Sequence, residues 1–179
     1  MYGSLVIGDP YCDAEEDDTA AARAAARANA IAATRYHAYL HTAQSIREVR
    51  IVLRVWEENP GKSWPPRNTD DNTWVYRTVS IECSEGQLIV DNVSAGPVGF
   101  EPGALERIPL SGGPGLFLLH VSIGGRNDIN ERIVSAWSIE DNNEQVEQLR
   151  LLDGYERYIV NIARVGPLTD DEDDDLDEE

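Results

Sequence analysis

The sequence has few of the side chains that usually carry metal sites, disulfides or nucleophilic catalysis. Its 179 residues include two cysteines and three histidines, and Lys62 is the single lysine. Neither cysteine belongs to a CxxC pair or lies at zinc-finger spacing from a histidine, which argues against a structural zinc site. Two cysteines are also too few for a disulfide framework, so we expect Cys12 and Cys83 to be reduced thiols.

Short motifs that bind phosphates or activate a nucleophile are also missing. The glycine clusters at 112–115 and 124–125 form neither GxGxxG nor GxxxxGK[ST], and they suit turns instead. No GxSxG elbow occurs, and only three histidines are available as a catalytic base. We therefore predict no cofactor and no enzymatic activity.

Long apolar runs are absent as well. The first residues, MYGSLVIGDP, contain no lysine or arginine and do not have the pattern of a secretory signal. The longest stretch without a formal charge is IPLSGGPGLFLLHVSIGG, which Pro, Gly, Ser and His interrupt, so it does not suit a membrane-spanning helix. We expect a cytoplasmic protein.

Basic residues are scarce relative to acidic ones. The chain has 15 lysines and arginines against 33 aspartates and glutamates, a net charge of −18. Nine acids lie in 170–179 and five more in 13–18, which leaves 19 acids against 15 bases elsewhere. This balance excludes a protein whose main task is to grip phosphate backbones, and any partner should be neutral or basic.

What the sequence does contain is a series of β-prone segments. The segment EVRIVLRVWEE alternates cleanly between apolar and polar positions, and WVYRTVSIEC, GQLIVDNVS, GLFLLHVSIGG and GYERYIVNIARVG follow with Gly, Asn and Ser between them. An earlier strand is expected at 4–7. This spacing predicts a mainly β protein, an antiparallel β-sandwich with one Ala-rich helix, over residues 1–168. The closing acidic run, 169–179, is predicted to be disordered, because like charges repel and little can be buried.

Helical signals are weaker and leave one alternative open. Acids before an Ala/Arg-rich run predict a helix from Thr19 to Ala33. The next segment, RYHAYLHTAQ, fits either a strand or a continuation of that helix. Between the last two β segments, we predict a strand at Ile133–Ile139 and a short helix at Asn143–Leu151.

Tryptophans and acids beside a Pro-rich loop, NPGKSWPPRNTDDN, suggest a binding surface, since aromatic side chains often anchor partners. The alternative is that the tryptophans plug one end of the sandwich. The candidate partner-binding residues, including the start of the acidic tail, are Trp56, Glu57, Glu58, Trp64, Asp70, Asp71, Trp74, Asp170, Asp171 and Glu172.

Two features have more than one interpretation. His37 and His41 would share a face in a helix or a strand and could bind a divalent metal, although HAYLH lacks the glutamate of HExxH. We assign no residue as a metal ligand, and the sequence alone does not decide whether His37 and His41 bind one. The acidic tail could keep the chain soluble, mimic phosphates, or steer a basic partner.

The order of these segments carries a resemblance. A leading strand and a helix-bearing connection precede RYHAYLHT, EVRIVLRVWEE, WVYRTVSIECSEGQLIVDNVSA, a segment ending LERIPLSGGPGLFLLHVSIGG, and ERYIVNIARV. Over most of residues 2–165, this order resembles the DNA-entry nuclease inhibitors of the competence protein J type. The resemblance implies a β-sandwich inhibitor that sequesters a nuclease by protein contact. The chain departs from that family in NPGKSWPPRNTDDN, in NDINERIVSAWSIEDNNEQVEQL and in the acidic tail.

The sequence thus predicts a non-enzymatic binding protein of the inhibitor or immunity type, with a basic protein such as a nuclease as its partner. Direct contact with nucleic acid or a membrane is not expected. One alternative is a structural or assembly component of a phage or secreted particle, whose exposed strand edges would pair with neighbours. Another is a carbohydrate-active hydrolase that uses loop carboxylates and tryptophans. Self-association stays open.

Overall fold

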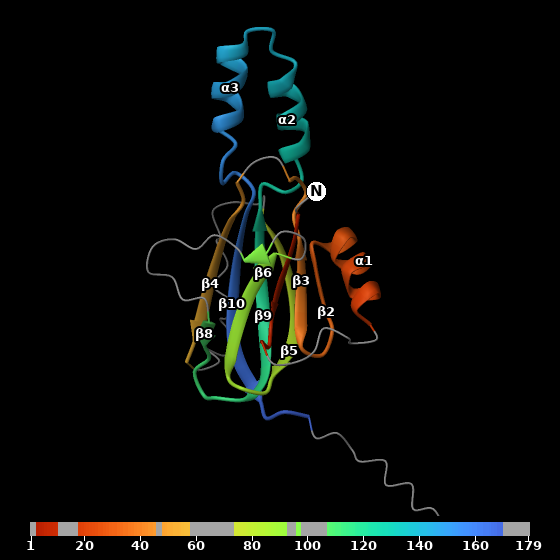
Figure 1. Cartoon of the computed structure of the whole chain (residues 1–179), viewed down its shortest axis with the longest axis vertical. Helices are drawn as coiled ribbons and strands as arrows, with labels where there is room; N and C mark the ends of the chain where they lie inside the picture. Colours follow the sequence, from red (N-terminus) through yellow and green to blue (C-terminus); the bar gives the residue numbers. More distant parts are fainter. Residues whose placement is uncertain are drawn as a thin grey trace, which may run out of the picture.

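The computed structural model describes residues 3–10, 18–45, 48–57, 74–92, 96–97 and 107–169 (Figure 1). These residues form two sheets and three helices. The first sheet has the order β2-β3-β1-β6-β7, with β8 paired to β6, and consists of β1 (Ser4–Gly8), β2 (Ile31–Ala33), β3 (His37–His41), β6 (Gln87–Asn92), β7 (Gly96–Pro97) and β8 (Arg107–Pro109). The second has the order β4-β10-β9-β5, from β4 (Arg50–Trp56), β5 (Val75–Cys83), β9 (Gly115–Gly124) and β10 (Arg157–Gly166). The prediction of a mainly β protein is confirmed.

One hydrophobic core draws side chains from both sheets. Alternate residues of β9 in the second sheet are almost completely buried: Phe117, Leu119, Val121 and Ile123. The same core includes Leu5 of β1 and Leu40 of β3 in the first sheet. Because successive side chains of a strand point to opposite faces, this core determines which residues of each strand point outward.

The alternating segment EVRIVLRVWEE forms β4, as its pattern predicts. Val49, Ile51, Leu53 and Val55 pack against the core, whereas Arg50 and Arg54 are exposed. Strand β4 runs parallel to β10, the one parallel pair among the described strands, which are otherwise paired antiparallel. The two strands start at the same end of the sheet, where the Gly154 amide donates a hydrogen bond to the Glu48 carbonyl at 2.9 Å.

Helix α1 (Thr19–Asn29) begins where the sequence predicts but ends at Asn29 rather than Ala33. Ala30 has a left-handed backbone, with φ 72°, and Ile31 then enters the core as the first residue of β2. Burial of Ile31 between the sheets outweighs the helix propensity of the alanines that follow it. The helix packs through Ala22 and Ala26 on Tyr39. Tyr39 lies on the outer face of the first sheet, because Ala38 and Leu40 on either side of it belong to the core. Figure 1 shows α1 beside this sheet.

The predicted strand at Ile133–Ile139 is wrong, because these residues belong mostly to helix α2 (Ile129–Trp137). Ile129, Ile133 and Ala136 recur at helical spacing, and together they form the buried face of this helix. The predicted helix at Asn143–Leu151 is confirmed as α3 (Asn142–Arg150). The two helices form a hairpin that projects from one end of the sheets (Figure 1). The described residues therefore form three helices, whereas the sequence predicts a single Ala-rich helix.

Several predictions lie outside the described residues: the loop at 59–72, Cys12, the acidic tail at 170–179 and most of the acidic cluster at 13–18. Cys83 is a free, buried thiol whose Sγ donates to the Gln87 carbonyl at 3.0 Å. Burial, and secondly the charge of Asp9, raise the pKa of this thiol to about 11, so it stays protonated. Among the described helices, none combines the length and apolar character needed to cross a membrane.

Candidate functional site

Three of the candidate partner-binding residues belong to the part of the chain that the structure describes. Glu57 is exposed directly after β4. Trp56, the last residue of β4, is half-buried, and its Nε1 donates to Asn161 Oδ1 at 3.2 Å. Trp74 is only 8% exposed and lies under the Arg157 guanidinium, 4.7 Å from the ring centroid.

The structure does not bring these two tryptophans together. Trp56 contacts β10 at Asn161 and Trp74 contacts it at Arg157. Four residues of a strand span about 13 Å. The remaining candidates lie outside the described residues, so their role in partner binding stays a prediction: Glu58, Trp64, Asp70, Asp71, Asp170, Asp171 and Glu172.

The two histidines of HAYLH lie on β3, which settles the alternative of strand or helix for this segment. Both side chains lie on the outer face of the first sheet, since Ala38 and Leu40 point into the core. Their separation along the strand, about 13 Å, is too large for both to bind one ion. Among the described residues, no cluster of three or more His, Cys, Asp or Glu side chains is placed to hold a metal.

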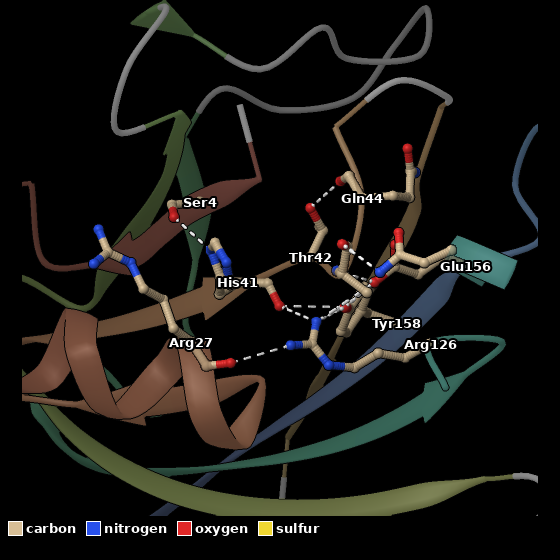
Figure 2. A network of polar contacts seen from close by, with 10 residues as sticks. Ser4, Arg27, His41, Thr42, Gln44, Arg126, Glu156 and Tyr158 are labelled. Atoms are coloured by element: carbon tan, nitrogen blue, oxygen red, sulfur yellow. Dashed lines mark hydrogen bonds and ion pairs between the residues drawn. The ribbon is translucent and has the colours of Figure 1, made fainter. Parts of the chain in front are cut away.

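A buried polar network lies where the α2–α3 hairpin leaves the sheets (Figure 2). Glu156, the residue directly before β10, is 0% exposed. Its Oε1 accepts hydrogen bonds from the Ala43 amide at 2.7 Å and from the Tyr158 hydroxyl at 2.5 Å. The Arg126 guanidinium lies 3.6 Å from the same oxygen. Burial, and secondly the negative charge of Glu156, raise the pKa of Tyr158, so its hydroxyl keeps the proton that it donates.

Arg126 connects this carboxylate to two other elements. Its Nη1 donates to the His41 carbonyl at the end of β3 and to the Tyr158 hydroxyl at 3.1 Å, and its Nη2 reaches the Arg27 carbonyl of α1 at 3.4 Å (Figure 2). Because Arg126 precedes α2 and Glu156 follows α3, the ion pair closes the base of the hairpin. Glu156 Oε2 has no hydrogen-bond partner among the described residues, so Arg126 supplies the positive charge that offsets this buried carboxylate.

His41 joins this network through its backbone, while its ring faces Ser4. The distance between Ser4 Oγ and His41 Nδ1 is 2.8 Å (Figure 2). Burial is the main reason why the pKa of His41 lies below its usual value of 6.5, and the positive charges of Arg126 and Arg27 lower it further. A hydrogen bond to the Gly3 backbone acts in the opposite direction. The imidazole is therefore neutral at pH 7. Its tautomer determines whether Nδ1 donates to the Ser4 hydroxyl or accepts from it.

The titration of His41 tests this electrostatic arrangement. The unfolded chain takes up a proton near pH 6.5, whereas folded His41 does so only at lower pH, so acidification through this window lowers the free energy of unfolding. We expect Arg126→Met to move the pKa of His41 upward, toward 6.5, because a nearby positive charge is removed. NMR titration of the imidazole would measure this, with His120 as the internal control. A His41 pKa that Arg126→Met leaves unchanged would contradict this account.

The second notable region is the α2–α3 hairpin itself, residues 128–153. Five large hydrophobic side chains are exposed in the described part of the chain, and four belong to this hairpin: Val134, Trp137, Val146 and Leu151. The same residues 128–153 contain seven acids and two arginines, whereas the other described residues contain eight acids and ten arginines. Exposed apolar side chains and the acidic surplus of the described residues therefore coincide on one projecting element.

Sequence reasoning missed these residues because it assigned Ile133–Ile139 to a strand. A strand would have placed Val134 and Trp137 on opposite faces, whereas in a helix residues three apart share one side. The helical recurrence of Ile129, Ile133 and Ala136 was the signal that could have found them.

The described residues thus define a mainly β protein with two sheets and three helices. No known family model matches the chain, and no curated protein matches it. The chain is similar to the crystal structure of ComJ, inhibitor of the DNA degrading activity of NucA, from Bacillus subtilis. The identity is 12%, the match covers 92% of this chain and 90% of that chain, and the TM-score is 0.45. A likeness of this size identifies neither a partner nor an activity.

Proposed function

We propose that the chain is a non-enzymatic binding protein of the inhibitor or immunity type, which sequesters a basic partner protein in the cytoplasm. The observation that carries this proposal is the charge, because 33 acidic residues against 15 basic residues give a net charge of −18. A surface dominated by one sign attracts partners of the opposite sign, raises the association rate and disfavours wrong partners.

A nuclease is the partner class that fits this charge best. Proteins that grip a phosphate backbone present lysine and arginine to it, and an acidic protein can occupy the same basic surface. The order of the β segments in the sequence, which resembles that of DNA-entry nuclease inhibitors, supports the same class.

Affinity capture from a lysate of the source cells tests the proposal. The baits are the full-length chain, a variant that lacks 170–179, and a full-length variant whose tail acids are changed to Asn and Gln, which keeps the length and removes the charge. We expect the full-length chain to capture one basic protein at low salt. Its binding should be weaker at moderate salt, because salt screens exposed charge pairs. The purified partner should then lose its DNA-degrading activity when the chain is added.

Two results would overturn the proposal. Recovery of the chain alone would favour an assembly component that pairs with its own copies. Capture of an acidic protein, with no dependence on salt, would remove the electrostatic basis of the proposal. If the neutral-tail variant binds as well as the full-length chain, the basic partner recognises acids outside 170–179.

A further inference from the structure

We infer that one side of the α2–α3 hairpin, carrying Val134 and Trp137, is the surface on which the basic partner docks. This inference rests on the proposed function, and it adds the place of contact and the chemistry of the contact. The partner is expected to present lysine or arginine around an apolar centre.

The exposure of apolar side chains on this hairpin is the first observation. Val134 is 65% exposed, Trp137 51%, Val146 48% and Leu151 64%, while α3 contains no fully buried residue. Exposed apolar side chains that gather on one element, rather than being scattered singly, mark an interaction surface. Tryptophan in particular is enriched among the residues that contribute most to binding.

Val134 and Trp137 form the centre of the proposed surface. Val134 and Trp137 are three residues apart on α2 and therefore lie on the same side of the helix. Gln145 Nε2 donates to the Trp137 carbonyl at 3.0 Å, so Val146, the next residue of α3, lies at the same free end of the hairpin as Trp137. An open depression of about 400 Å³ lies beside Val134 and is lined by Asn130, Glu131, Val134 and Ser135. The aliphatic stem of a lysine or arginine could contact Val134 there while its charged end meets Glu131.

Charge complementarity selects the occupant. Residues 128–153 have a surplus of five negative charges, from seven acids and two arginines, whereas the other described residues have a small positive surplus. A basic surface would therefore be attracted to this element in preference to the rest of the described body. A second copy of the chain, with its own net charge of −18, would be repelled.

The hairpin is also held in place before any partner arrives. At its base, the Tyr155 hydroxyl donates to Asp128 Oδ2 at 2.7 Å, and Arg132 Nε donates to the same oxygen at 2.7 Å. The Arg132 guanidinium lies 4.5 Å from the centroid of the Tyr155 ring. The buried pair of Arg126 and Glu156 closes the same end. A preorganised surface loses less conformational entropy when it binds, which favours affinity.

The test uses the full chain and two synthetic helical peptides, one of leucine and lysine and one of leucine and glutamate. Chemical-shift mapping by NMR would locate each peptide, and calorimetry would measure its affinity. We expect the lysine peptide to shift amides within 128–153. The double variant Val134→Ser, Trp137→Ser should weaken its binding about tenfold, in the range of centrally placed interface residues. Both side chains are exposed, so unchanged thermal unfolding should show that this variant folds.

Two matched controls separate the hairpin from general effects. Val165→Ser removes an exposed apolar side chain from β10 instead, and it should leave the affinity unchanged. Glu131→Gln with Glu147→Gln should weaken binding of the lysine peptide, whereas Glu57→Gln with Glu85→Gln, which changes the net charge equally, should not. All four glutamates are exposed.

Three other outcomes of the peptide experiment would each contradict a different claim. Binding of the lysine peptide only outside 128–153 would overturn the docking surface and leave the proposed function standing. Equal binding of both peptides would remove the charge preference on which the proposed function rests. Amide chemical shifts within 128–153 that change with protein concentration in the absence of peptide would indicate a contact between two copies of the chain. This result would overturn the inference.

Discussion

Replacement of Arg126 by methionine is expected to lower the free energy of unfolding by about 3 kcal/mol, because it leaves a buried carboxylate without its positive partner. Glu156 is 0% exposed, and its Oε2 has no hydrogen-bond partner among the described residues. The Arg126 side chain is 17% exposed and also donates to the His41 carbonyl, so its removal leaves that oxygen with fewer donors. Denaturant unfolding followed by circular dichroism would measure the loss.

A double-mutant cycle separates charge from packing. Glu156→Gln keeps an oxygen that can accept from the Ala43 amide and the Tyr158 hydroxyl, but it removes the buried charge. Once this charge is absent, Arg126→Met should cost clearly less than it does in the natural chain. An equal cost in both backgrounds would show that Arg126 acts through its stem and its carbonyl contacts, and that the ion pair is not what holds the base of the hairpin.

The strands with one buried face could be predicted from the sequence. In EVRIVLRVWEE the apolar positions recur every second residue, and this local pattern is sufficient to identify β4 and its inner face. The same holds for β9, whose alternate residues Phe117, Leu119, Val121 and Ile123 are buried. The parallel pairing of β4 with β10 could not be read this way, because it joins segments about a hundred residues apart along the chain.

Short apolar runs were the main source of error. In IVSAWSI, apolar residues are frequent enough to fit both a strand and a helix, and only the wider window that includes Ile129 shows the helical spacing. In the same way, the helix propensity of the alanines at 30–33 does not reveal that Ile31 is buried between the sheets.

Only part of the candidate site could be predicted from the sequence. The acidic surplus of 128–153 can be counted in the sequence, but the exposure of Val134 and Trp137 depends on the helical assignment. The polar network at the base of the hairpin could not be predicted from the sequence. It joins Arg126 to the carbonyls of His41 and Arg27 and to Glu156. Contacts of this kind depend on the tertiary arrangement of four elements and have no local sequence signal.

Gly125 is the position where the chain turns from β9 toward α2, and its replacement by alanine is expected to lower the free energy of unfolding by about 3 kcal/mol. Two effects add there. The backbone has φ +72°, which disfavours any side chain. In addition, an alanine Cβ would contact the Tyr155 carbonyl oxygen and lie 3.0 Å from its carbonyl carbon, where backbone cannot move aside without shifting the start of β10.

Gly113 provides a matched control for this prediction. It has the same φ of +72°, but a Cβ built on it would meet nothing within 4 Å. Gly113→Ala should therefore cost only the backbone strain, about 1 kcal/mol. Thermal or denaturant unfolding of the two variants measures the difference, which reports the crowding against Tyr155. Equal losses would mean that β9 and β10 separate easily at this point. The hairpin would then be attached less rigidly than the contacts of Tyr155 with Asp128 and Arg132 indicate.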